Sequence, residues 1–455
     1  MKNHKEMITN KIQWFVGSGF LFVLELFGVS AQVSATPVYA TPVYTSPVYV
    51  SPVYATVQQE DSLAYYIQVA IENNPGVKSQ AYAHGASLEK IPQAGALPDP
   101  ELSLEAYTEP MEIIGGRSLG NVGLMQMLPW FGTKKAARAE AVHRARVQEQ
   151  RYRETINGLV LEVRARWYAM QALKEQLKFS RENKELLDQL EQLALRGMGA
   201  GAGSGMSEVL RIQLEAAELE NRMESLRAQL QAEKARFNAL LNREANAGIS
   251  LSPEMRKVPV LFNEEETLAA LERNNPTLGM ISEEGLAFKA KAKADRKMSQ
   301  PRIGLGVQYM VIGQTDEPMF AMGDMNGNDM IMPMVSVSLP LFRKKYNAQQ
   351  RESELWRKSA AENYRNTLNT LRGEYYRLKS QLDDADRALN LYEKQTNLAE
   401  TAYRLIVKEF VSGKSDLTQV LEVQRQLLDY QLRQAEALAS YNTTAASIEQ
   451  LIATQ

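Results

Sequence analysis

The 455-residue chain contains no cysteine. This absence excludes thiol nucleophiles, disulfide bridges and cysteine-ligated zinc together, and it suits an oxidising compartment. Histidine is almost as scarce, with three residues, and the formal net charge is only −2. A charge so close to zero supplies no general attraction for nucleic acid, and the sequence has no basic run with interleaved aromatic residues. No nucleic-acid partner is therefore expected.

Long apolar runs are scarce as well. The one that stands out runs from Trp14 to Val29, after several basic residues, and ends among small residues. This order is typical of a signal peptide, here residues 1–31 with cleavage after Ala31; a retained membrane anchor is the alternative. No later stretch approaches the length of a membrane helix. If the exported chain enters a bilayer, it must do so with strands.

Residues 32–59 carry a five-residue repeat with a proline in each copy, at Pro37, Pro42, Pro47 and Pro52. Proline at this spacing forbids a helix and favours extended, polyproline-like chain. We interpret the segment as a semi-rigid tether, with a docking motif for an aromatic groove as the alternative.

The remainder of the chain contains two copies of one sequence pattern. IENNP at residues 71–75 returns as ERNNP at residues 272–276, and LPWFG at residues 128–132 returns as LPLFR at residues 339–343. The offset grows from 201 to 211 residues between these motifs, so the second copy has about ten extra residues before its last strand. We predict two repeats, residues 60–250 and 251–455, each with a helix, a β-hairpin and a long helical hairpin.

Long amphipathic helices are expected over residues 133–196 and 345–408. Leu159, Val163 and Trp167 illustrate the apolar spacing of three and four residues, on a background of good helix formers. At 1.5 Å per residue each helix would reach roughly 90–100 Å. A glycine-bearing turn follows each one, and a second helix then returns. Hairpins of such length need lateral neighbours to cover their apolar stripes.

The segments between the helices alternate instead with period two. Ile303, Leu305 and Val307 are separated by glycines, and residues 102–107 and 335–339 alternate in the same way. This pattern is typical of outer-membrane barrel strands, with a half-buried strand of a soluble sheet as the alternative. One hairpin per repeat gives four strands per chain. Four strands cannot close a barrel and an open edge cannot lie in lipid, so several chains must contribute.

The paired NNP starts, the strand ends LPWFG and LPLFR, and FVSGKSDLTQVLEVQRQLL at residues 410–428 resemble the TolC-like outer-membrane efflux factor family. This resemblance implies a mainly helical fold with a β-barrel portion. The helical hairpins would form a periplasmic helical barrel, and four strands per chain would join a trimeric, twelve-stranded outer-membrane barrel. AGALPDPELSLEAY and LPWFGTKKAARAEA are similar to the heavy-metal-efflux branch typified by CzcC and CusC. The chain departs from many members of that branch in lacking an N-terminal cysteine for lipidation.

The function implied is that of a passive outer-membrane channel of a tripartite efflux pump, exporting metal cations and needing no cofactor. Its partners would be two further copies of the chain in a homotrimer, a periplasmic adaptor (membrane fusion) protein, an inner-membrane efflux transporter and outer-membrane lipid. A channel for drugs or other small molecules and a pore-free periplasmic coiled-coil scaffold are the alternatives. The sequence contains no catalytic constellation, and Gly413-Lys414-Ser415 lacks the first glycine of a phosphate loop. We therefore expect no enzyme.

By the same resemblance the helical tips converge on a closed aperture in the periplasm. Glu208, Asp416 and Glu422 stand near the tips, and threefold repetition would place like charges around one axis, which favours cations. The alternative is that acidic residues there serve the helix dipole, with Asp416 as an N-cap. Gly413 and Lys414 are the expected adaptor contacts.

Methionine gathers in residues 317–334. Thioethers are soft ligands suited to Cu(I) or Ag(I), so this loop is a candidate metal site, with a flexible apolar loop as the alternative. The candidate ligands are Met319, Met322, Met325 and Met330.

Overall fold

The computed structural model describes residues 62–199, 205–252, 254–260, 262–321 and 323–453. The chain divides into two units, residues 1–57 and 58–455, and everything described here belongs to the second. The expected signal peptide (1–31) and tether (32–59) lie outside the described residues.

Each half of the described unit has the same order of elements, which confirms the predicted duplication. The first half contains α2 (Leu63–Asn73), α3 (Pro75–Gly95), β1 (Glu101–Ile113), β2 (Gly116–Leu128), α4 (Thr133–Gly199) and α5 (Met206–Leu240). The second contains α6 (Glu264–Asn274), α7 (Pro276–Met298), β3 (Arg302–Gly313), the short 3-10 helix η1 (Gly323–Met325), β4 (Met330–Ser338), α8 (Arg343–Val411) and α9 (Leu417–Ile452).

The repeated Asn-Asn-Pro motif has the same structural role in both halves. Asn74 and Asn275 are the N-caps of α3 and α7, and each accepts two backbone N–H bonds through Oδ1. Each Nδ2 also donates across the fold, to Leu240 O at 3.0 Å and to Leu451 O at 2.9 Å. Both acceptors lie at the C-terminal end of the second helix of a hairpin, α5 or α9. Each asparagine therefore caps the start of one helix and also bonds to the end of a long hairpin.

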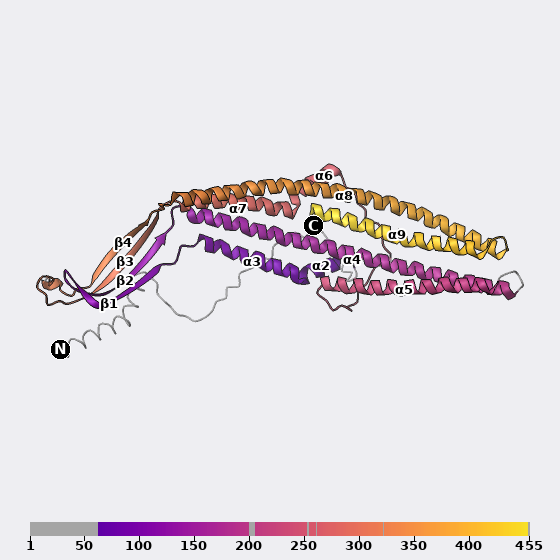
Figure 1. Cartoon of the computed structure of the whole chain (residues 1–455), viewed down its shortest axis with the longest axis horizontal. Helices are drawn as coiled ribbons and strands as arrows, with labels where there is room; N and C mark the ends of the chain where they lie inside the picture. Colours follow the sequence, from indigo (N-terminus) through magenta and orange to yellow (C-terminus); the bar gives the residue numbers. More distant parts are fainter. Residues whose placement is uncertain (1–61, 200–204, 253, 261, 322, 454–455) are drawn as a thin grey trace, which may run out of the picture. The chain divides into compact units, whose positions relative to one another are not determined.

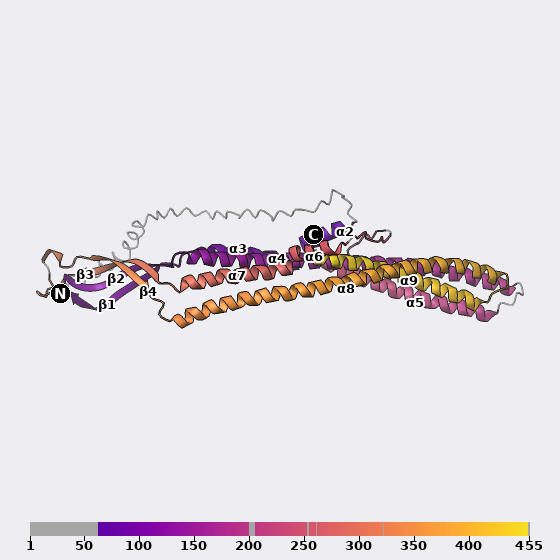
Figure 2. The same ribbon diagram turned by 90° about the horizontal axis from the view of Figure 1, so that it is seen from above.

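The long helices α4 and α8 contain 67 and 69 residues, close to the predicted bounds and to each other. The predicted stripe is buried: Val163 and Trp167 expose 0% and 4% of their surface. The helices α4 with α5, and α8 with α9, form two hairpins (Figure 1), and α8 and α9 lie side by side in the perpendicular view as well (Figure 2). The strands lie at one end of α4 and α8, and the first residues of α5 and α9 lie near the other end (Figure 1).

None of the helices in the described part of the chain combines the length and the apolar composition that crossing a membrane requires.

The strands form one antiparallel sheet in the order β1-β2-β3-β4. A two-residue turn joins β1 to β2, and Gly116 at its end has φ +139° where an added Cβ would lie 2.3 Å from Gly313 O. Residues 314–329 join β3 to β4, which is where the sequence offset placed the extra residues of the second copy. The central pair, β2 with β3, joins the two repeats from Arg117↔Gly313 to Leu128↔Ile303.

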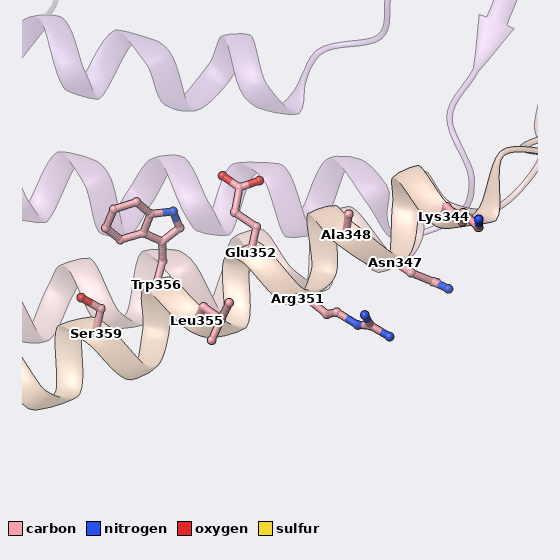
Figure 3. Close-up of a pocket in the computed structure, with 8 residues that line it drawn as sticks. All are labelled: Lys344, Asn347, Ala348, Arg351, Glu352, Leu355, Trp356 and Ser359. Carbon is pink, nitrogen blue, oxygen red and sulfur yellow. The ribbon is translucent and has the colours of Figure 1, made fainter.

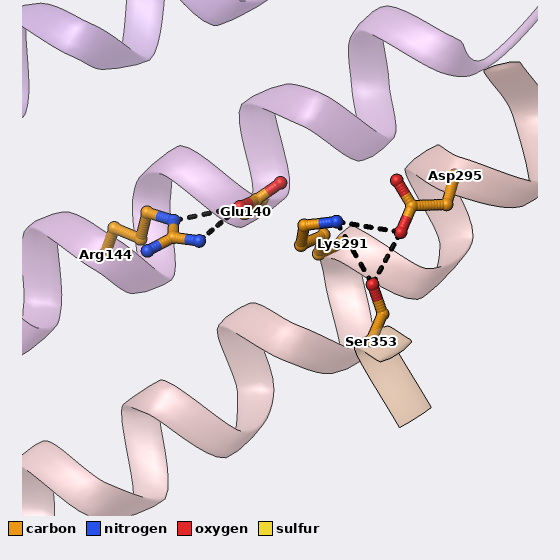
Figure 4. Close-up of polar contacts among 5 residues, drawn as sticks. All are labelled: Glu140, Arg144, Lys291, Asp295 and Ser353. Carbon is orange, nitrogen blue, oxygen red and sulfur yellow. Dashed lines mark hydrogen bonds and ion pairs between the residues drawn. The ribbon is translucent and has the colours of Figure 1, made fainter. Parts of the chain in front are cut away.

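Near the sheet, a buried polar group ties α7 to α8 (Figure 4). Asp295 has a side chain only 3% exposed, and its Oδ2 accepts from Lys291 Nζ at 2.9 Å and from Ser353 Oγ at 2.5 Å. The figure also shows the Glu140–Arg144 pair on α4, which lies within one helix. A buried carboxylate with two partners fixes the register of α7 against α8 at the point where the strands begin.

Candidate functional site

The sheet has one aliphatic face and one polar face, as the alternation predicts. On the aliphatic face Leu104, Leu305 and Val335 are 70%, 50% and 70% exposed. The register places the following residues together on that face: Leu102, Leu104, Val122, Leu124, Ile303, Leu305, Val307, Ile331, Val335 and Val337. A contiguous aliphatic surface of this kind requires an apolar surrounding.

The opposite face carries polar groups that bond to one another. Asn121 is 5% exposed, and its Nδ2 donates to Glu105 Oε2 at 2.9 Å and to Tyr107 OH at 3.0 Å. The Tyr107 hydroxyl donates in turn to Glu105 Oε2 at 3.1 Å. A carboxylate held by two donors on β1 and β2 gives this face a fixed negative charge.

The turn between α8 and α9 contains three of the residues that the sequence singled out. Gly413 has φ +70°, and Lys414 N donates back to Glu409 O at 2.9 Å, which closes the last turn of α8. Asp416 is the N-cap of α9 and accepts from Gln419 N at 2.9 Å. The observed contact of Asp416 is therefore the capping one.

The other two acidic candidates lie on different helices. Glu208 is in the first turn of α5, half-buried, and its Oε2 is shielded from solvent, whereas Glu422 is exposed on α9. Residues 200–204 of the first tip lie outside the described residues. An aperture role for these carboxylates stays a prediction.

The starts of α5 and α9 are bonded to each other, which sequence reasoning missed. Arg211 Nη1 donates to Thr418 Oγ1 at 3.1 Å, and Arg425 Nε donates to Glu215 Oε2 at 2.9 Å. The partners are more than 200 residues apart in the chain, and no local sequence pattern predicts such pairs. These links hold the N-terminal part of α5, which carries Glu208, against the N-terminal part of α9, which follows the N-cap Asp416.

The loop methionines are largely exposed. Met319 and Met325 are 83% and 59% exposed, Met330 begins β4, and Met322 lies outside the described residues. The sulfurs that converge belong instead to Met125 and Met127 on β2, beside Ser336. Residues 122–128 do not alternate in polarity, because Gln126 lies on the face of Leu124 and Leu128, so no local pattern placed these methionines on the polar face.

No group of three or more His, Asp or Glu side chains in the described residues could hold a metal ion. A groove on α8 is lined by Lys344, Asn347, Ala348, Arg351, Glu352, Leu355, Trp356 and Ser359 (Figure 3). All of these belong to one helix, and Trp356 stacks on Phe288 of α7 with ring centroids 5.8 Å apart. The groove is thus an open helix face rather than an enclosed ligand pocket.

Comparison with known proteins follows the same division into halves. A family model described as "Outer membrane efflux protein" matches residues 66–243 and 268–454. No curated protein sequence gives a significant match.

Among solved structures, the chain is similar to the outer-membrane channel OprN, with 16% identity, a TM-score of 0.70 and coverage of 86% of this chain and 90% of that one. It is similar to VceC from Vibrio cholerae, with 15% identity, a TM-score of 0.68 and coverage of 86% and 95%. It is also similar to CusC, with 13% identity, a TM-score of 0.71 and coverage of 88% and 95%.

Proposed function

The chain belongs to the outer membrane efflux protein family, and from this premise we propose that it exports metal cations as a homotrimer. Family membership makes it an outer-membrane efflux channel with a periplasmic helical portion, and not an enzyme. In the proposal, an inner-membrane transporter supplies the energy and a periplasmic adaptor joins the two. We also propose that the two repeats of the family fold span residues 60–250 and 251–455.

Association into a trimer is supported by one observation: the sheet combines an exposed aliphatic face with two open edges. In the described chain β1 and β4 each pair with one neighbour only. Unpaired backbone groups cannot lie in lipid, so the β4 edge of one copy must pair with the β1 edge of the next.

The helices at the flanks of the two hairpins support the same arrangement. The helix α8 exposes Leu391, Leu398 and Leu405, seven residues apart and 50–71% exposed, and α5 exposes Leu210 and Leu214 at 53% and 71%. A seven-residue apolar spacing is typical of a helix that packs against another helix. In the proposal, α8 of one copy packs against α5 of the next.

The proposal that the exported substrate is a metal cation is based on the polar face of the sheet. In a closed barrel this face lines the channel, and it carries Glu101 and Glu105 in each copy, in register with Met125 and Asn121. Rings of carboxylates favour cations in a pore. The similarity to CusC and the motifs of the heavy-metal-efflux branch point the same way.

At the periplasmic end, Glu208, Asp416 and Glu422 form the proposed aperture, and Gly413 and Lys414 the adaptor contact. The exposed turn at Gly413, where an added Cβ would meet nothing within 4 Å, leaves room for a partner. At the other end, the loop of Met319, Met322, Met325 and Met330 is proposed to meet cations at the exit.

The test is deletion of the gene followed by growth on copper, silver, zinc and cobalt salts, beside a panel of dyes and antibiotics. The proposal expects sensitivity to one or more metals, restored by the wild-type gene. Sensitivity to dyes alone would overturn the metal assignment in favour of small-molecule efflux. A protein that is recovered without detergent and forms no conductance in planar bilayers would overturn the channel.

A further inference from the structure

We propose that Met125, Met127 and Ser336 form a binding site for a soft monovalent cation, Cu(I) or Ag(I), on the polar face of the sheet. This inference rests on the proposed function in one respect, because that face lines the channel only if the trimeric barrel closes. It concerns different residues from the methionine loop at 317–334.

The two sulfurs converge on one point. Ser336 Oγ lies 3.8 Å from Met125 Sδ and 3.7 Å from Met127 Sδ. Both sulfurs also lie within 3.0 Å of the position that a Cβ on Gly304 would occupy. Two thioethers and a hydroxyl therefore surround the same small volume, although they come from β2 and β4, which are not neighbours in the sheet.

Glycine on the intervening strand makes this convergence possible. Gly304 pairs with Met127 on one side and with Ser336 on the other, and Gly306 pairs with Met125 and Met334. A Cβ at residue 304 would lie 2.2 Å from Ser336 Oγ and 2.7 Å from Met127 Sδ. Glycine in a strand interior often marks a place where another group approaches closely, and here the group is a pair of methionine side chains.

Packing alone does not explain these methionines. No residue of the sheet belongs to the apolar core clusters of the described chain, and Met125 and Met127 are only half-buried. Over the same stretch the aliphatic face carries Leu124, Gln126 and Leu128, whereas Met125 and Met127 lie on the face that carries serine and glutamate. A polar face that selects thioethers favours a ligand role.

The chemistry suits a soft ion in transit. Thioether sulfur selects Cu(I) and similarly soft ions over Zn²⁺, Mg²⁺ or Ca²⁺. Neutral ligands bind a monovalent ion without trapping it by charge, and a channel site must be weak enough to release its ion. Two charged residues border the site on this face: Glu101, in register with Met125, and Arg302, which is in register with Ser338 and donates to its Oγ at 3.5 Å.

The experiment is titration of the purified, detergent-solubilised full-length protein with Ag(I) by calorimetry. Wild type is compared with the double variant Met125→Leu/Met127→Leu and with the control Met298→Leu, an exposed residue at the end of α7. The double variant is expected to bind one silver ion fewer per chain, and the control to match wild type. Equal stoichiometry and affinity in the double variant and wild type would overturn the site.

A second variant distinguishes loss of the site from misfolding of the protein. Gly304→Ala keeps both sulfurs but displaces them, so it is expected to weaken Ag(I) binding at this site while the far-UV circular dichroism stays at the wild-type value. Unchanged Ag(I) binding in this variant would also count against the site.

Conductance in planar bilayers separates the two proposals. A wild-type protein that conducts, together with a double variant that binds silver normally, refutes this site and leaves the channel standing. A wild-type protein that neither inserts nor conducts refutes the channel itself, whatever silver it binds.

Discussion

At the scale of single residues, Asn275 shows how one side chain can serve two elements. It is 7% exposed, its Oδ1 caps α7, and its Nδ2 satisfies the carbonyl of Leu451. Asn275→Ala removes the cap and leaves that carbonyl without this donor, so we expect a loss of about 2–3 kcal/mol of stability. A thermal melt in detergent, followed by circular dichroism, measures it.

The matched control is Asn275→Ser, which keeps a side-chain oxygen for the cap and loses the amide donor to Leu451 O. Its melting temperature is expected between those of wild type and Asn275→Ala. If the alanine variant melts at the wild-type temperature, the double role assigned to Asn275 is wrong.

A second residue-scale prediction concerns acid. Hydrogen bonds from Lys379 and then from Tyr376 lower the pKa of Glu264, at the start of α6, below its ordinary value of 4.5. Because the folded-state pKa is the lower one, this stabilisation is present above about pH 4.5 and is lost as the pH falls through the folded-state pKa. Glu264→Gln should therefore reduce the drop in melting temperature between neutral and strongly acidic pH. The control is Glu265→Gln on the same turn, and an identical drop in both variants would refute the assignment.

At the scale of helices, a polar seam inside an apolar cluster joins α4 to α9. Asn183 Nδ2 donates to Gln431 Oε1 at 2.7 Å, and Gln424 Nε2 donates to Asn183 Oδ1 at 3.2 Å. All three side chains are at most 6% exposed. The seam sets the register between the hairpins of the two repeats, because apolar neighbours alone would tolerate several registers.

Asn183→Leu should destabilise the protein by about 1–3 kcal/mol, since it leaves two glutamine amides buried without their partner. Replacing Asn183, Gln424 and Gln431 together by leucine should recover much of the loss, because no polar group then remains unpaired. Thermal melts of the single and triple variants decide the matter. A triple variant less stable than the single one would show that the seam stabilises the fold outright.

At the scale of the whole molecule, the two faces of the sheet should respond oppositely to charge. Leu305→Lys places an ammonium on the aliphatic face, where lysine costs about 2–4 kcal/mol at the bilayer midplane. Gln308→Lys places the same charge on the polar face, three positions further along β3. We expect the first variant to be depleted from the outer-membrane fraction and the second to be retained, as measured by immunoblot. Equal retention of both would contradict the assignment of the faces.

The last prediction concerns the contact between copies of the chain in the proposed trimer. Leu398 is 71% exposed at the centre of the α8 stripe, and Leu398→Glu should lower the trimer fraction because it buries a charge between helices. Asn397→Glu adds the same charge one position earlier, off the stripe, and should leave the trimer intact. Light scattering after size-exclusion chromatography in detergent compares the two, and trimers of equal abundance would rule out this contact.

The sequence by itself determined the features that depend on short spacings. Period-two alternation separated the faces of the strands, apolar spacings of three and four residues set the long helices, and Asn-Asn-Pro marked equivalent helix starts in two repeats. These features follow from the geometry of one strand or one helix, which a few neighbouring residues dictate.

Only the tertiary structure decided which distant segments meet. The pairing of β2 with β3, the Asn183 seam, the Arg211–Thr418 link and the convergence of Met125 with Ser336 all join residues far apart in the chain. Each depends on register between separate elements, and that register is set by packing of the whole chain. Local spacing carries no record of it, which is why the methionine pair became visible only once the strands were side by side.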